Sequence, residues 1–146
     1  MKKKDSTYLS KSLFIRGVRC HKSLYLHKYK PDLKDAVSEE TEKLFEAGYQ
    51  IGTLAQNLFP GGVLVPYEGL SHKEQIEMTA SFIADGCRTI YEATFFYNDV
   101  FIKADILHYG DDGWDVYEVK NSTEVKDYHI DDAAVQYHVI TGSGLH

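Results

Sequence analysis

The stretch that decides the fold is residues 89–120, which reads TIYEATFFYNDVFIKADILHYGDDGWDVYEVK. It consists of three segments rich in aromatic and β-branched residues, separated by two short polar turns. The first turn, Asn98-Asp99, has residue types that accept the left-handed backbone of a two-residue hairpin. The second turn, residues 111–113, ends in glycine. We therefore predict three consecutive antiparallel strands over residues 89–97, 100–109 and 114–120.

The segments around these strands have the patterns of helices. Ser38 is a suitable N-cap for a helix with one apolar face, formed by Leu44, Gly48, Ile51, Ala55 and Leu58. Ser71 and Glu74 have the spacing of a capping box at the start of another helix. We expect helices over residues 10–29 (one helix or two short ones), 38–58, 71–84 and 127–140, with a short strand over 63–65. This order predicts an α/β domain in which helices flank a mixed sheet.

The length of 146 residues predicts a single domain, residues 1–146. Its hydrophobic fraction of 43% and charged fraction of 26% are typical of folded proteins. No run of 18 apolar residues is present, so we expect no membrane partner. The two cysteines, Cys20 and Cys87, are too few for a disulfide framework and indicate a cytoplasmic location. Because the chain stops soon after its final helix, we expect it to be a fragment of a longer protein.

The charge is distributed unevenly along the chain. The formal net charge of −6 by itself argues against binding to phosphates. Residues 1–30, however, carry nine lysines and arginines against one acidic residue, a balance of +8, compared with −14 for residues 31–146. Such asymmetry is typical of nucleic-acid or membrane contact, and a solvated basic helix has the same composition. We predict that this basic helical segment contacts nucleic acid through Lys11, Arg16, Arg19 and Lys22.

Three residues of the predicted strands suit metal-dependent chemistry. Asp105 lies near the end of the second strand, and the tight turn brings it opposite the third strand, about level with residues 119–120. Glu118 and Lys120 are two positions apart on that strand and therefore share a face. The two carboxylates and the main-chain carbonyl of Val119 would form a hard-oxygen site for Mg²⁺ or Mn²⁺. The lysine can orient a metal-bound water, assist its deprotonation or stabilise charge on a phosphate.

This order of elements, with an Asp and then a Glu-x-Lys on successive strands between two helices, resembles the PD-(D/E)XK nuclease superfamily. Within it, the chain is most similar to the RecB-like branch, which includes the CRISPR-associated RecB-like exonucleases. The resemblance extends to an N-terminal element at residues 9–12 and 19–26 and to a first core helix at residues 47–56. Gln136, in the last predicted helix, matches the glutamine of the RecB-type motif.

The resemblance implies a restriction-endonuclease-like core and a metal-dependent nuclease that hydrolyses DNA, with single-stranded DNA favoured. It implies that Asp105 and Glu118 bind Mg²⁺ or Mn²⁺ and that Lys120 activates the attacking water. It further implies that Gln136 holds the catalytic lysine region or the DNA. Glu92, near the start of the first strand, is either an accessory residue beside the metal or half of a surface salt bridge.

Three departures from the family pattern leave other functions open. Gln56 stands four residues after a helix glycine, where many RecB-like nucleases have a histidine ligand, and Ile140 replaces a motif tyrosine. Cys20 matches the first cysteine of the iron–sulfur members, but the three further cysteines are missing, so an iron–sulfur cluster is unsupported. One alternative is a non-catalytic member that binds nucleic acid or a protein partner. The other is an unrelated protein in which Glu118 and Lys120 form a structural ion pair.

Overall fold

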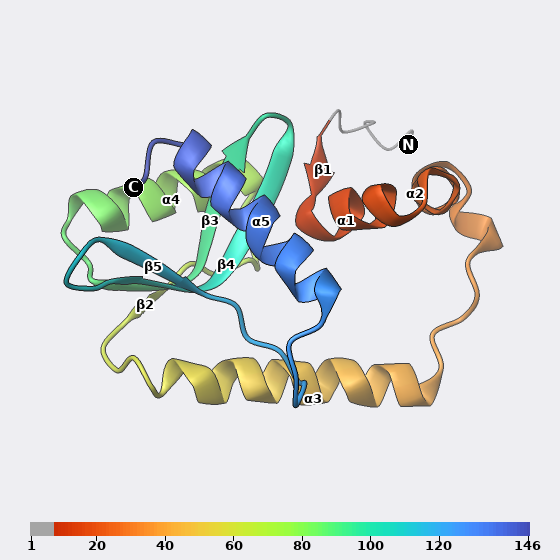
Figure 1. Cartoon of the computed structure of the whole chain (residues 1–146), viewed down its shortest axis with the longest axis horizontal. Coiled ribbons are helices and arrows are strands. Elements are labelled where there is room, and N and C mark those ends of the chain that lie inside the picture. The colour runs from red at the N-terminus through yellow and green to blue at the C-terminus, as the bar shows by residue number, and fades with distance from the viewer. Residues whose placement is uncertain (1–7) are drawn as a thin grey trace.

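The computed structural model describes residues 8–146, which fold into an α/β arrangement around one mixed sheet (Figure 1). Its strands are β1 (Leu9–Ser10), β2 (Val63–Leu64), β3 (Thr89–Tyr97), β4 (Val100–Tyr109) and β5 (Trp114–Tyr117). β4 pairs antiparallel with β3 and, along its other edge, antiparallel with β5. β1 joins β4 and β2 joins β3, both in the parallel direction. Parallel and antiparallel pairs therefore coexist, and the predicted mixed sheet is confirmed.

The β3–β4 hairpin is the part of the fold that the sequence predicts best. Tyr97 pairs with Val100, which leaves Asn98 and Asp99 as the two-residue loop. Both loop residues have positive φ angles, 50° and 60°, which match the tight turn expected for these residue types. The bounds of both strands agree with the prediction.

The helices are α1 (Lys11–Arg19), α2 (His21–Tyr29), α3 (Glu39–Gln56), α4 (His72–Ala84) and α5 (Asp127–Gly142), with a short 3₁₀ helix, η1 (Pro31–Leu33), after α2. The predicted segment 10–29 forms two helices because Cys20 between them has an extended backbone, with φ −161° and ψ 106°. Ser38 caps α3 as expected. The capping box of Ser71 and Glu74 is also present at the start of α4.

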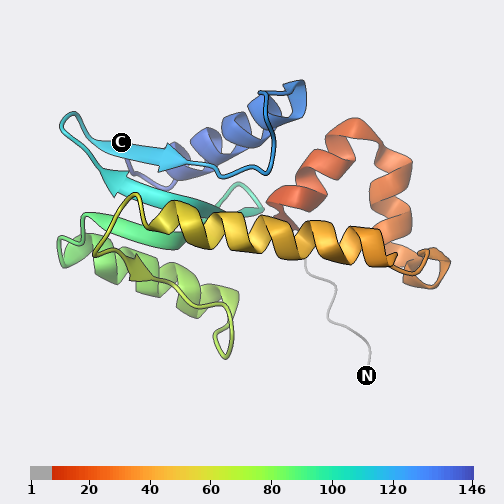
Figure 2. The same cartoon turned by 90° about the horizontal axis from the view of Figure 1, so that it is seen from below.

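The core lies between the sheet and two helices, α4 and α5, which cover opposite faces of it (Figures 1 and 2). The buried side chains of the core include Ile90, Ala93, Ile102, Ala104, Leu107 and Val139. A buried hydrogen bond links α4 to β3, where the Thr94 N–H donates to the Thr79 hydroxyl at 2.9 Å. Because both faces are covered, consecutive residues of β3 and β4 are buried, such as 89–91 and 100–102, rather than every second residue.

The third strand differs from its prediction in length and register. β5 ends at Tyr117, so Glu118 and Lys120 follow the strand instead of lying on it. Tyr117 pairs with Ile106, and continuing that register places Asp105 level with Glu118 rather than with residues 119–120. The predicted strand was too long because the apolar pattern continues through Val119, although the ladder stops at Tyr117.

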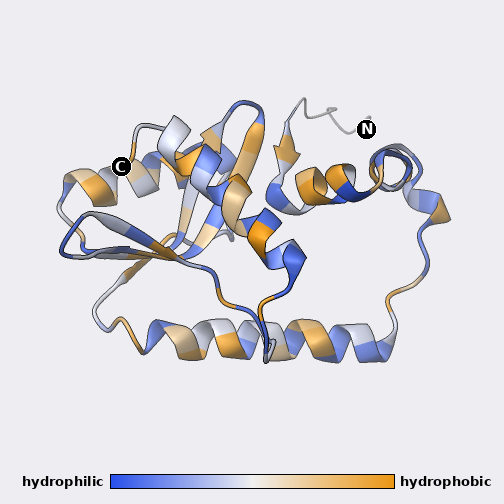
Figure 3. Ribbon diagram, in the orientation of Figure 1, coloured by the Kyte–Doolittle hydropathy of each residue, from blue (hydrophilic) through white to orange (hydrophobic). Residues whose placement is uncertain are grey.

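Helix α3 does not bury the apolar face that its sequence predicts. None of its residues is buried, and Leu44, at the N-terminal end of that face, is 65% exposed. Hydrophobic residues lie along its length, and its ribbon runs apart from the helices that pack on the sheet (Figure 3). Ile51 and Ala55 are half-buried, so packing is confined to the C-terminal half. None of the described helices combines the length and apolar character that a bilayer crossing requires.

Candidate functional site

The candidate site lies where β1 and β5 converge along one edge of β4. β1 pairs with Val100 and Phe101, whereas β5 pairs with residues 106–109. Because β1 is parallel to β4 and β5 is antiparallel, both strands run toward the gap between them, beside residues 102–105. Lys11 directly follows β1, and Glu118 directly follows β5. The topology therefore brings together two residues that are 107 positions apart in the sequence.

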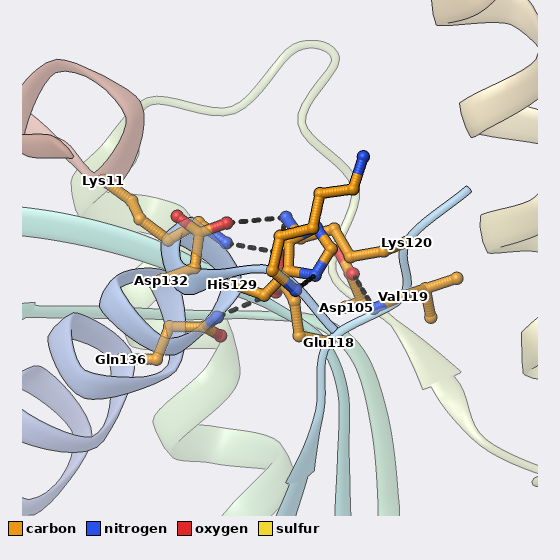
Figure 4. A network of polar contacts seen from close by, with 9 residues as sticks. Lys11, Asp105, Glu118, Val119, Lys120, His129, Asp132 and Gln136 are labelled. Carbon is orange, nitrogen blue, oxygen red and sulfur yellow. Dashed lines mark hydrogen bonds and ion pairs between the residues drawn. The ribbon is translucent and has the colours of Figure 1, made fainter. Parts of the chain in front are cut away.

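Glu118 is the centre of a polar network (Figure 4). Its Oε1 accepts hydrogen bonds from the ammonium groups of Lys11 at 2.7 Å and Lys120 at 2.6 Å. Its Oε2 accepts a hydrogen bond from the Gln136 side-chain amide at 2.8 Å. Burial alone would raise the pKa of Glu118, but the two ammonium groups outweigh it and hold the pKa below its ordinary value. Glu118 is therefore an anion at neutral pH.

Lys120 is held between two carboxylates. Its ammonium donates to Glu118 and, at 2.7 Å, to Oδ2 of Asp132. Burial lowers the pKa of Lys120, but both carboxylates act in the opposite direction and the net pKa lies above its ordinary value. The protonated form suits stabilisation of charge on a phosphate better than removal of a proton from water. Gln136 lies one helical turn after Asp132 on α5, so both side chains reach the end of β5.

Asp105 belongs to a row of three acidic residues across the sheet. The strand register places it level with Glu118 after β5 and with Glu92 on β3. Its Oδ2 accepts the main-chain N–H of Val119 at 2.7 Å. Burial and repulsion by Glu118 raise the pKa of Asp105, and burial and repulsion by Asp105 raise the pKa of Glu92. Glu92 is thus part of the site, and a bound cation would relieve the repulsion along this row.

The donor chemistry of the row suits a hard divalent cation, because carboxylate oxygens are the preferred ligands of Mg²⁺ and Mn²⁺. Gln136 Oε1 adds a buried amide oxygen that accepts no hydrogen bond from the described residues. Among residues 8–146, however, no three His, Cys, Asp or Glu side chains are grouped as metal ligands. Both oxygens of Glu118 already accept hydrogen bonds. These donors use both lone pairs of Oε1 and one of the two on Oε2, which leaves a single lone pair of Glu118 for a cation.

A cleft of about 450 Å³ opens beside Asp105 and Glu92. Its opposite wall is the C-terminal half of α3, including Tyr49 and Gln56. Tyr67, from the segment after β2, completes the lining together with Leu64 and Val65. The structure thus places Gln56 in the lining of the cleft beside Asp105 and Glu92, together with two tyrosines that the sequence did not single out.

The basic N-terminal segment contributes unequally to this region. Lys11 lies inside the network around Glu118. Arg16 and Arg19 line a neighbouring hollow whose wall includes Asp132, the partner of Lys120. Lys22 lies exposed on α2, in a different hollow from the acidic row. The remaining lysines of the segment's start, Lys2, Lys3 and Lys4, lie outside the described residues.

Sequence reasoning missed two partners in the network. Asp132 could have been identified from the sequence, because it precedes Gln136 by four residues on a predicted helix and therefore lies on the same helical face. The contact of Lys11 with Glu118 could not be identified in this way, because it depends on two short strands that share one edge of β4.

Comparisons of the chain with protein-family models, with curated proteins and with solved structures return no match.

Proposed function

We propose that the chain is a metal-dependent nuclease with a restriction-endonuclease-like core, which hydrolyses phosphodiester bonds of DNA. The observation that carries this proposal is the convergence of Glu118, Lys120 and Gln136, with Asp105 level with Glu118 on the adjacent strand. Buried carboxylates are costly unless they are paired or serve a function. Here one of them, Asp105, is half-buried, accepts only a main-chain N–H among the described contacts and has a raised pKa.

In this proposal each residue has a defined task. Asp105, Glu118 and the Val119 carbonyl would hold Mg²⁺ or Mn²⁺, which supplies Lewis acidity and lowers the pKa of water. The Lys120 ammonium stabilises the negative charge that builds on the phosphate as water oxygen attacks phosphorus. The bond from phosphorus to one ester oxygen breaks, and that oxygen leaves as a hydroxyl after taking a proton. Asp132 and Gln136 keep Lys120 and Glu118 in position.

Single-stranded DNA is the favoured substrate because of the cleft beside Asp105. Tyr49 and Tyr67 line this cleft and are 75% and 63% exposed, so their rings are available to stack on unpaired bases. The Lys103 ammonium lies 5.3 Å from the centre of the Tyr67 ring and places positive charge at the same edge. Stacking and nearby positive charge together are the usual means of binding single strands.

The test is cleavage of end-labelled single-stranded DNA by the purified chain, with Mg²⁺, with Mn²⁺ and with a chelator. We expect cleavage with either metal, a loss of at least a hundredfold in Lys120→Gln and Asp105→Asn, and no loss in the exposed control Lys126→Gln. A folded chain that cleaves no substrate with any metal contradicts the proposal.

The hydrogen bonds to Glu118 favour a second candidate, a nucleic-acid-binding member that does not cleave. Glu118 already accepts hydrogen bonds from Lys11, Lys120 and Gln136, which leave it one lone pair for a metal ion. The same assay separates the two candidates. DNA binding that is independent of metal and occurs without cleavage identifies the non-catalytic protein. If the chain neither binds nor cleaves DNA, the ion pairs around Glu118 have a structural role only.

A further inference from the structure

We propose that a hollow between α1, α2 and η1 binds phosphates of the single-stranded DNA at a second position, away from the acidic row. We call it the basic hollow. The charged and titratable residues of its lining are Arg16, Lys22, His27, Lys30, Lys34 and Asp35. The inference rests on the proposed function for the identity of its ligand, a DNA strand. It adds residues up to Lys34 to the nucleic-acid surface and requires no metal.

The basic hollow carries four formal positive charges, from one arginine and three lysines, against the single negative charge of Asp35. Partial burial lowers the pKa of His27, and the positive charges of Arg16 and Lys34 lower it further. The fields of cations from α1 and from the segment after η1 therefore add at the His27 ring. An anion at this place would be attracted by several side chains at once.

The lysines of the basic hollow have no acidic partner within the part of the chain that the structure describes. No ion pair with any of residues 8–146 is formed by Lys22, Lys30 or Lys34. Lys11, in contrast, is paired with Glu118 at 2.7 Å. The hollow has a volume of about 430 Å³, within the range of ligand sites. A phosphate group entering it would meet cations that need not give up an internal partner.

Helix α1 connects the basic hollow with the polar network around Glu118. Its first residue, Lys11, contacts Glu118, and Cys20, directly after its last residue, lines the basic hollow. Arg16 lines both the basic hollow and the neighbouring hollow that contains Asp132, so the two hollows adjoin. The 9 residues of α1 span about 14 Å, or about four nucleotides at a stacked spacing of about 3.4 Å. One strand can therefore occupy the network and the basic hollow together.

The salt dependence of binding to labelled single-stranded DNA, measured with a chelator present to prevent cleavage, tests the basic hollow. For single strands, the slope of log affinity against log salt changes by about 0.7 for each phosphate contact. We expect the double variant Lys30→Gln/Lys34→Gln to reduce the slope by at least about 0.7, equally for oligo-dT and oligo-dC. The control Lys43→Gln/Lys73→Gln removes two exposed charges outside the hollow and should leave the slope unchanged.

The length of the oligonucleotide provides a second measurement. In the unmodified chain, affinity should rise steeply once the strand exceeds about four nucleotides, because one strand then occupies both positions. This rise should be absent in Lys30→Gln/Lys34→Gln. Both lysine side chains are exposed, so the double variant should fold like the unmodified chain, which circular dichroism checks.

Three results overturn the inference. DNA binding by the unmodified chain with no change of slope in Lys30→Gln/Lys34→Gln overturns the basic hollow and leaves the nuclease proposal standing. Absence of DNA binding by the unmodified chain overturns the basic hollow, and absence of cleavage as well overturns the nuclease proposal. Binding to phosphatidylserine vesicles that the double variant loses, without a change in its DNA slope, assigns the hollow to a lipid surface instead.

Discussion

The β3–β4 hairpin and helix α3 start from similar sequence signals and end in opposite environments. Both have regular apolar patterns and clear boundary residues, and both form where the sequence predicts them. Ile90 and Leu107 in the hairpin are fully buried, whereas Leu44, Phe45 and Tyr49 in α3 are each at least 65% exposed. An apolar pattern thus specifies the element, and the availability of a packing partner decides its burial.

The difference comes from how each element is attached. The hairpin is covered by α4 and α5 and contributes most of the buried core. The described attachment of α3 is near its C-terminal end, where the Tyr91 hydroxyl hydrogen-bonds to the carbonyl groups of Gln56 and Phe59. The C-terminal half of α3, which this contact attaches, forms one wall of the cleft, while the hairpin carries Glu92 and Asp105 on the opposite side.

The largest expected effect compares two leucines. Leu107→Ala removes a fully buried side chain from the core and should lower the free energy of unfolding by about 2–5 kcal/mol. Leu44→Ala removes an exposed side chain of α3 and should change it by less than about 0.5 kcal/mol. Urea denaturation followed by circular dichroism measures both, and equal losses would mean that α3 is packed as tightly as the hairpin.

A smaller effect is expected from two helical glycines. A Cβ at Gly142 of α5 would lie 2.2 Å from the Tyr97 ring, so Gly142→Ala should destabilise the fold by about 1–3 kcal/mol. A Cβ at Gly48 of α3 meets nothing within 4 Å, and Gly48→Ala should stabilise by about 0.5–1 kcal/mol through helix propensity. Thermal unfolding of the two variants measures the difference in stability. The prediction is contradicted if both substitutions shift the unfolding temperature in the same direction.

The exposed face of α3 should matter for binding rather than for stability. Tyr49→Ala should leave thermal unfolding unchanged and weaken single-stranded DNA binding about tenfold, by loss of one stacking contact. Fluorescence anisotropy with a labelled oligonucleotide measures the affinity. The matched control is Phe45→Ala, which removes a similarly exposed aromatic ring outside the cleft. Equal weakening in both variants argues against a specific stacking position.

The smallest expected effect is the change in stability when the charge of Asp105, on β4, is removed. The pKa of Asp105 is raised by burial and by Glu118, so its ionised form opposes folding at neutral pH. Asp105→Asn should therefore stabilise the chain by roughly 1 kcal/mol at pH 7. The gain should shrink as the pH falls through the pKa of Asp105, because protonated aspartate and asparagine are both neutral. Thermal unfolding across pH values checks this sign, and a gain that grows toward acid contradicts it.

The sequence by itself determined the helices and strands and the two acidic residues, Asp105 and Glu118, that lie level with each other. Local rules suffice for the Asn98-Asp99 turn, the Ser71 capping box and both long strands, because turn and cap preferences involve neighbouring residues. The alternation of strand residues and the turn lengths also place Asp105 near Glu118 to within two positions.

Only the tertiary structure decided which partners surround those acids. The early end of β5, the row that includes Glu92, and the contact between Lys11 and Glu118 all depend on strands that pair across long separations. The same holds for the exposure of α3, since its apolar face has the pattern of a buried helix. The apolar periodicity of a segment reflects the preference of each residue for water or for the core. Burial and ion pairing depend on which distant segment packs beside that residue.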